Sequence, residues 1–68
     1  MSKLTVNGTM RAYEPQTVEE LIAALGMDPL RRGIAVAVNE AVLPRAAWAK
    51  TRVSPGDVIE VVQPLAGG

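Results

Sequence analysis

One segment of this chain is patterned as a capped amphipathic helix, and it lies between stretches patterned as strands. The segment is TVEELIAALG (residues 17–26), in which Thr17 and Glu20 have the spacing of a capping box. Its apolar residues recur at i, i+3, i+4 and i+7 and form one stripe: Val18, Leu21, Ile22 and Leu25. Gly26 follows the stripe and predicts the end of the helix. Because one stripe covers one surface, the pattern predicts a helix that lies on a single face of a sheet.

The stretch before this helix predicts a β-hairpin. KLTVNGTMRAY (residues 3–13) begins with alternating polar and apolar residues, as a half-buried strand does. Asn7-Gly8 is a strong signal for a two-residue hairpin turn, since both residues tolerate positive φ. Residues 9–13 are the expected returning strand, and Pro15 ends it.

Three more strands are expected after the helix. IAVAVNE (residues 34–40) is almost wholly apolar and has β-branched residues at alternate positions, which is typical of a strand in the middle of a sheet. Residues 41–43 predict a short edge strand, because Pro44 follows them. After a turn with the sequence SPGD, the stretch DVIEVVQ (residues 57–63) predicts the last strand, which Pro64 ends.

The order of these elements predicts an α+β fold. The last strand can pair in parallel with the first because the chain between them crosses the sheet. That arrangement is the ubiquitin-like β-grasp, a mixed sheet of four to five strands covered by one main helix. We therefore expect residues 57–63 to pair in parallel with residues 3–7, under the apolar stripe of the helix. Residues 1–68 are predicted to form a single β-grasp domain, with 64–68 as an extended, flexible C-terminal tail.

Composition excludes several classes of function. The chain has 68 residues with seven basic and seven acidic side chains, so its net charge is zero. That balance gives no electrostatic basis for binding nucleic acid or an anionic membrane. The absence of Cys and His removes disulfides, thiolate chemistry, His-based catalysis and the commonest metal ligand. The start, MSKLTVNG, lacks an apolar signal segment, and no apolar run approaches membrane length, so we expect a soluble cytoplasmic protein.

The chain closes on QPLAGG, and this end is the candidate functional segment. Glycine is common in disordered ends, but Gly-Gly arises by chance in roughly 0.5% of chains at average glycine usage. A terminal glycine offers its α-carboxylate with no side chain beside it, so a slot too narrow for a Cβ still admits it. We therefore interpret the carboxylate of Gly68 as the reacting group.

Six pieces of the sequence carry a family resemblance. They are VNG at 6–8, TVEELIAALG at 17–26, AVAVNE at 35–40, PRAAW at 44–48, PGDVIEVV at 55–62 and GG at 67–68. In this order, and over nearly the whole chain, they resemble the ThiS family, the sulfur carrier proteins of thiamine biosynthesis. One departure lies in the second hairpin, where many members have Asn-Gly-Glu and this chain has Asn39-Glu40-Ala41. That departure leaves the turn type open.

The resemblance implies a carrier that partner enzymes act on, and not an enzyme. A ThiF-type adenylyltransferase would use ATP to convert the Gly68 carboxylate to an acyl-adenylate. Sulfur from a cysteine-desulfurase relay would displace AMP and leave a thiocarboxylate, which a ThiG-type thiazole synthase would consume. No cofactor or metal is expected on the chain itself. Leu65, Ala66 and Gly67 are the expected partner-binding residues, since bare backbone lets the walls of a partner's site approach and Leu65 offers an apolar anchor.

Other interpretations share the fold. Residues 64–68 also resemble the tail of the small sulfur-carrying subunit of molybdopterin synthase, but that relative lacks the Pro44-Arg45 to Trp48 segment. A ubiquitin-like protein modifier would instead form isopeptide bonds, and a plain interaction domain would tolerate loss of both glycines. Trp48 is expected to pack in the core rather than serve as a partner hot spot. Arg45 is expected to be solvated or to bond a local carbonyl.

The sheet face away from the helix is the expected docking surface. Strands rich in valine leave more apolar surface than one helix can cover. We therefore expect the adenylyltransferase and the thiazole synthase to dock there, near the last strand.

Overall fold

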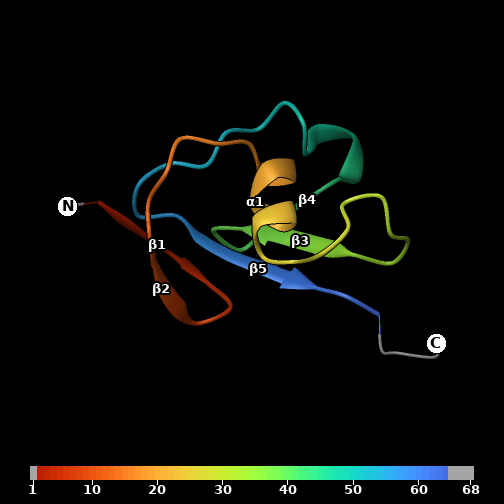
Figure 1. Cartoon of the computed structure of the whole chain (residues 1–68), viewed down its shortest axis with the longest axis horizontal. Coiled ribbons are helices and arrows are strands. Elements are labelled where there is room, and N and C mark those ends of the chain that lie inside the picture. The colour runs from red at the N-terminus through yellow and green to blue at the C-terminus, as the bar shows by residue number, and fades with distance from the viewer. Residues whose placement is uncertain (1, 65–68) are drawn as a thin grey trace.

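The computed structural model describes residues 2–64, and in these the five strands form one mixed sheet. The elements in chain order are β1 (Lys3–Val6), β2 (Thr9–Ala12), α1 (Val18–Ala24), β3 (Ala35–Val38), β4 (Ala41–Leu43), the 3₁₀ helix η1 (Arg45–Ala47) and β5 (Val58–Val62). The strand order across the sheet is β2-β1-β5-β3-β4, and α1 lies over one face of it (Figure 1). The predicted β-grasp is therefore confirmed, with five strands in the sheet.

The first and last strands lie side by side in the middle of the sheet. β5 runs parallel to β1, with Thr5 opposite Val58 and Val6 opposite Ile59. On its other side β5 runs antiparallel to β3. The strand that leads into the C-terminal tail is thus bonded on both edges.

The predicted capping box begins α1. The backbone N–H of Glu20 donates to Thr17 Oγ1 over 3.1 Å, and the backbone N–H of Thr17 donates to Glu20 Oε1 over 2.8 Å. The bond from the Thr17 backbone N–H, and after it the bond that the Thr17 hydroxyl donates to Glu20 Oε1 over 3.2 Å, hold the pKa of the Glu20 carboxyl below its usual value. At the other end Leu25 is the C-cap, and Gly26 has a φ of +87°, the left-handed conformation that ends many helices.

The core lies between α1 and the face of the sheet that it covers. It consists of Leu4, Val6, Val18, Leu21, Ile22, Ile34, Val36, Trp48, Val53, Ile59 and Val61. Leu25 packs against this cluster and is partly buried, so the whole predicted stripe of the helix contributes. Trp48 is 2% exposed, and its indole Nε1 donates to the Leu43 carbonyl over 3.1 Å. Its expected role in packing is confirmed.

The other face of the sheet is open among the described residues. Four large apolar side chains are exposed there. Met10 lies on β2, Val42 lies on β4, and Val58 and Val62 lie on the central strand β5. The pairing places them on one face, since each either alternates with core-facing residues of its own strand or lies opposite a residue that does so. This is the apolar surface that the valine-rich strands predicted.

Candidate functional site

The four predicted site residues, Leu65, Ala66, Gly67 and Gly68, lie outside the described residues. The structure does describe β5, which leads to them, and Pro64, from which they continue. The described part of the site is therefore the root of the tail, where β5 ends at Pro64. Three groups of contacts hold this root and the strand that leads to it: the pairing of β5, two asparagine side chains, and the loop between α1 and β3.

β5 is held by its buried face as well as by its neighbours. Ile59 is fully buried and Val61 is 5% exposed, so the strand contributes two side chains to the core. Its last two residues pair with β3, where Val61 lies opposite Val36 and Val62 opposite Ala35. The backbone is thus fixed to within two residues of Pro64.

Asn7 bonds the end of β5 that lies near the tail. Its backbone N–H donates to the Ile59 carbonyl over 2.9 Å. Its side-chain amide then pairs with both backbone groups of Val61: Oδ1 accepts from the N–H over 2.8 Å, and Nδ2 donates to the carbonyl over 3.1 Å. Because β1 turns into β2 at this residue, the side chain extends the ladder where the backbone of β1 has left it. The sequence predicted Asn7 as a turn residue and gave no sign of this second role.

Asn39 makes the corresponding contact at the start of β5. Its Oδ1 accepts from the backbone N–H of Val58 over 2.9 Å, and its own backbone N–H donates to the Val58 carbonyl over 2.7 Å. Its Nδ2 donates to Asp57 Oδ1 over 3.0 Å. Each hairpin thus contributes one asparagine to β5: Asn39 bonds its first residue, and Asn7 bonds it near its last.

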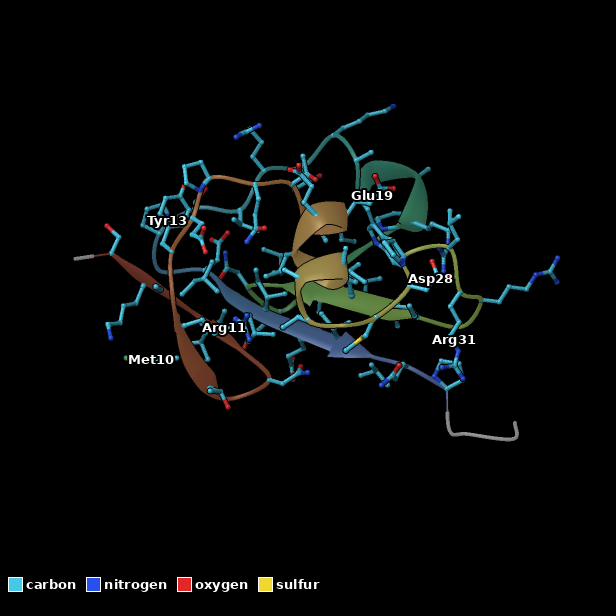
Figure 2. All side chains as sticks on the ribbon, in the orientation of Figure 1. Met10, Arg11, Tyr13, Glu19, Asp28 and Arg31 are labelled. Carbon is cyan, nitrogen blue, oxygen red and sulfur yellow. The ribbon has the colours of Figure 1, made fainter. Side chains whose placement is uncertain are left out.

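The loop between α1 and β3 carries the third contact. Gly33 in this loop lies so close to the Pro64 ring that a Cβ built on it would be 2.9 Å from Pro64 Cγ. The loop lies beside the segment that leaves β5, and Figure 2 shows its labelled residues Asp28 and Arg31 at this end of the molecule. The tail thus begins against a loop that is distant from it in the sequence.

Arg45 ties that loop to the core. Its guanidinium donates to the backbone carbonyls of Pro29 and Arg31, and it stacks over the Trp48 ring with Cζ 4.4 Å from the ring centroid. The expectation that Arg45 bonds a carbonyl is right, but these carbonyls are not local, since they lie 16 and 14 positions earlier in the chain. The PRAAW segment therefore supports the loop on which Pro64 rests.

Within residues 2–64 no pocket opens, and no three His, Cys, Asp or Glu side chains gather where a metal ion could bind. None of the helices in this part of the chain is long and apolar enough to cross a membrane. The features that stand out near the tail are accordingly the ordered root and the apolar face of the sheet beside it.

Comparison with known proteins gives the family. The ThiS family model matches residues 4–68. The chain belongs to the ThiS family. A ThiS relative, the sulfur carrier protein of Escherichia coli K12, is 41% identical over 59 residues, which are 87% of this chain and 86% of that protein.

Two solved structures and one longer protein are also similar to this chain. ThiS of Geobacter metallireducens, a thiamine biosynthesis protein solved by crystallography, superposes with a TM-score of 0.74 at 34% identity over 97% of this chain and 99% of that one. Its solution structure gives a TM-score of 0.75 at 37% identity over 100% and 88%. A thiazole synthase of Paramagnetospirillum magneticum is 37% identical over 67 residues, which are 97% of this chain but 20% of the length of that protein.

Proposed function

We propose that this ThiS protein is a sulfur carrier of thiamine biosynthesis and that the carboxylate of Gly68 carries the sulfur. The observation that supports the proposal most is that the family match runs through residue 68 and so includes the terminal Gly-Gly. The similarity to a sulfur carrier protein over 86% of that protein's length supports it further. The protein is then a co-substrate of partner enzymes, and the expected cytoplasmic location stays a prediction.

The chemistry follows from the state of the carboxylate. An α-carboxyl group has a reference pKa of about 3.3–3.7, so at neutral pH it is an anion and a poor electrophile. A carboxylate oxygen attacks the α-phosphorus of ATP, and pyrophosphate leaves. The outer sulfur of a persulfide from the desulfurase relay then attacks the acyl carbon, AMP leaves with its oxygen, and an acyl disulfide forms. A thiol of a partner protein attacks the donor's sulfur in this acyl disulfide, forms a new disulfide with the donor, and releases the thiocarboxylate. ATP is held by the adenylyltransferase in this scheme.

The described domain contributes a fixed starting point for the tail. β5 is bonded by β3 up to Val62 and, on its other edge, by the Asn7 side chain up to Val61, and Pro64 lies against the loop at Gly33. From there Leu65 to Gly68 span at most about 13–14 Å, at 3.3–3.6 Å per extended residue. That reach suits an acyl group that reacts inside a partner while the domain stays outside. The bare backbone at Gly67 and Gly68 admits the narrow passage that excluding water requires.

We assign the open face of the sheet to docking of the adenylyltransferase and the thiazole synthase. Val58 and Val62 are 50% and 63% exposed on the strand that leads to the tail, so a partner that covers them also lies beside the tail. The similarity of this chain to a segment of a protein named thiazole synthase supports that enzyme as one partner.

Deletion of Gly68 tests the carrier proposal. The deletion withdraws the carboxylate by one residue, about 3.3–3.6 Å, whereas a misplacement of 1 Å already costs about 10²-fold in rate. Pyrophosphate release with the adenylyltransferase and thiocarboxylate by intact mass should both fall by at least that factor, and thermal unfolding should not change. Gly67→Ala keeps the reach and so separates loss of reach from added bulk, and Gly67→Val should be worse than Gly67→Ala because its side chain is larger. If the deletion variant accepts sulfur at the normal rate, the terminal carboxylate is not the carrier.

A pair of charged substitutions tests the docking face. Val62→Asp places a charge on β5 beside the tail, and Val42→Asp places the same charge on the edge strand β4, where Val42 is 80% exposed. Exposed substitutions of this kind usually change stability by no more than about 0.5 kcal/mol. Binding to the adenylyltransferase should weaken about tenfold or more for Val62→Asp and less for Val42→Asp, as measured by calorimetry. If both variants bind with the affinity of the wild-type chain, the open face of the sheet is not the docking surface.

A further inference from the structure

Gly33 is one of several glycines with a positive φ, and it alone among those described lies against the root of the tail. Its φ is +87°, and a Cβ built on it would lie 2.9 Å from Pro64 Cγ and 3.4 Å from Pro64 Cδ. Side-chain Cβ atoms essentially never come as close as the first of these distances. The absence of a side chain at Gly33 therefore allows Pro64 to rest directly on the loop between α1 and β3.

The loop surface under Pro64 is itself anchored. Asp28 closes a turn by accepting from the backbone N–H of Leu30 through its side chain and from that of Arg31 through its carbonyl, each over 2.9 Å. Arg45 bonds the Pro29 and Arg31 carbonyls and stacks on Trp48, which is buried in the core. The position of Gly33 is thus tied to the core by contacts on its own loop.

Pro64 transmits this position to the chain that follows. Its ring fixes its own φ near about −65° and restricts the preceding residue to extended conformations. A displacement of the Pro64 ring is therefore not absorbed by its own φ. It instead shifts the point from which Leu65 continues.

We propose that Gly33, supported by Arg45, is a positioning residue for the sulfur-carrying tail. Gly33 acts through Pro64: by leaving room for the ring, it sets the point at which residues 65–68 start toward a partner's active site. The inference rests on the proposed function and adds to it a residue, far from the tail in sequence, that sets where the carboxylate arrives. The docking face of the sheet is not involved, so a change at Gly33 affects the reaction of the bound complex and not the formation of that complex.

The size of the effect follows from the geometry. An added Cβ must separate from Pro64 Cγ to about 3.5–4.0 Å, the optimal distance between carbon atoms. Since misplacement by about 1 Å lowers a rate by about 10²-fold, a shift of roughly this size predicts a fall in kcat of about tenfold or more. The KM for the carrier protein should stay the same, because the docking surface is intact.

Gly33→Ala is the test variant, and Gly56→Ala is its matched control. Gly56 has nearly the same conformation, a φ of +84°, but a Cβ built on it meets nothing within 4 Å. Both variants place alanine in the left-handed region, so both should lower the unfolding temperature by a similar amount. A fall in the kcat of adenylation, measured by pyrophosphate release, is expected for Gly33→Ala alone.

A double-mutant cycle separates the steric contact from general damage to the loop. Pro64→Ala removes Cγ and Cδ and leaves Cβ, which lies 3.5 Å from the added atom, an ordinary contact. In the Pro64→Ala background, Gly33→Ala should therefore lower kcat by less than about twofold. A loss as large as in the wild-type background would overturn the proposal.

A spectroscopic readout separates failure of this inference from failure of the proposed function. Backbone amide NMR signals of residues 65–68 should shift in Gly33→Ala and stay in place in Gly56→Ala, whether or not the chain accepts sulfur. If the wild-type chain is not adenylated, the proposed function fails and these signals still decide the inference. If the wild-type chain is adenylated but Gly33→Ala matches Gly56→Ala in kcat or in the tail signals, Gly33 has no positioning role.

Arg45→Lys provides a second variant should Gly33→Ala not fold. Lysine keeps the charge but lacks the planar fork that bonds two carbonyls at once. The expected result is a smaller fall in kcat, again with an unchanged KM. An unchanged kcat would show that the anchoring of the loop does not affect the tail.

Discussion

The two hairpins of the sheet have the same backbone conformation and different residues at the second turn position. Asn7-Gly8 joins β1 to β2 with φ values of 50° and 81°, and Asn39-Glu40 joins β3 to β4 with 51° and 71°. Both are therefore two-residue turns of the type with positive φ at each position. Glycine adopts this conformation without strain, whereas a left-handed glutamate is disfavoured by roughly 1–2 kcal/mol. The register between β3 and β4 therefore imposes a positive φ on Glu40, although glutamate disfavours that conformation.

The asparagines explain why both turns are kept. Each one bonds β5 with its side-chain amide, Asn7 at Val61 and Asn39 at Val58. The two sites differ in exposure, since Val61 is 5% exposed and Val58 is 50% exposed. Water can replace the bond to Val58 more readily than the bonds to Val61. The side-chain bonds of Asn7, beside the tail, therefore contribute more to stability than those of Asn39 at the start of β5.

Replacing Asn7 by glycine should have the largest effect. Gly keeps the positive φ accessible and removes the amide, so it leaves the N–H and carbonyl of buried Val61 without their partner. An unsatisfied buried group costs about 1–3 kcal/mol, and we expect a loss of roughly 2–3 kcal/mol in the free energy of unfolding, measured by urea denaturation. A loss under about 0.5 kcal/mol would mean that the amide does not hold β5.

The same substitution at Asn39 should have a smaller effect. Asn39→Gly removes the bonds to Val58 and Asp57 at a site that solvent reaches. We expect a loss of about 1 kcal/mol, the usual net contribution of one hydrogen bond. Because the substitution and the backbone conformation match those of Asn7→Gly, the difference between the two variants measures the effect of burial. Equal losses of unfolding free energy in the two variants would show that burial does not distinguish the Asn7 bonds from the Asn39 bonds.

Local signals in the sequence predicted the elements of the fold. The capping box, the Asn7-Gly8 turn and the alternation in β1 depend on neighbouring residues, and the structure has all three. The parallel pairing of the first and last strands followed from the order of elements. The resemblance to ThiS, carried by short motifs along the chain, is confirmed by the family match.

The contacts at the root of the tail could not be predicted in this way. The amide of Asn7 meets Val61 across 54 positions, and Gly33 meets Pro64 across the β3–β4 hairpin, η1 and β5. Such partners are set by the tertiary register, and a turn signal such as Asn-Gly reports only on its own backbone. For Asn39-Glu40 the local signal was ambiguous for the same reason, because glutamate does not indicate a left-handed turn. The predicted tail residues Leu65 to Gly68 lie beyond the described part, so their roles stay predictions.

Glu40→Gly should have the smallest effect and the opposite sign. The substitution removes the strain of a left-handed glutamate, which stabilises the fold by roughly 1–2 kcal/mol. Glycine also raises the conformational entropy of the unfolded chain, which removes about 0.4–1 kcal/mol of that gain. We expect a net stabilisation of about 0.5–1 kcal/mol by urea denaturation, with the adenylation rate unchanged because Glu40 is remote from the root of the tail.

Glu40→Ala removes the charge but keeps a Cβ at the same φ of 71°, so it should give no such gain. The reverse substitution, Gly8→Glu, meets no atom within 4 Å of its Cβ and should destabilise the first hairpin by a similar amount through φ alone. If Glu40→Gly and Glu40→Ala stabilise equally, the effect comes from the charge, and the two turns do not differ by strain.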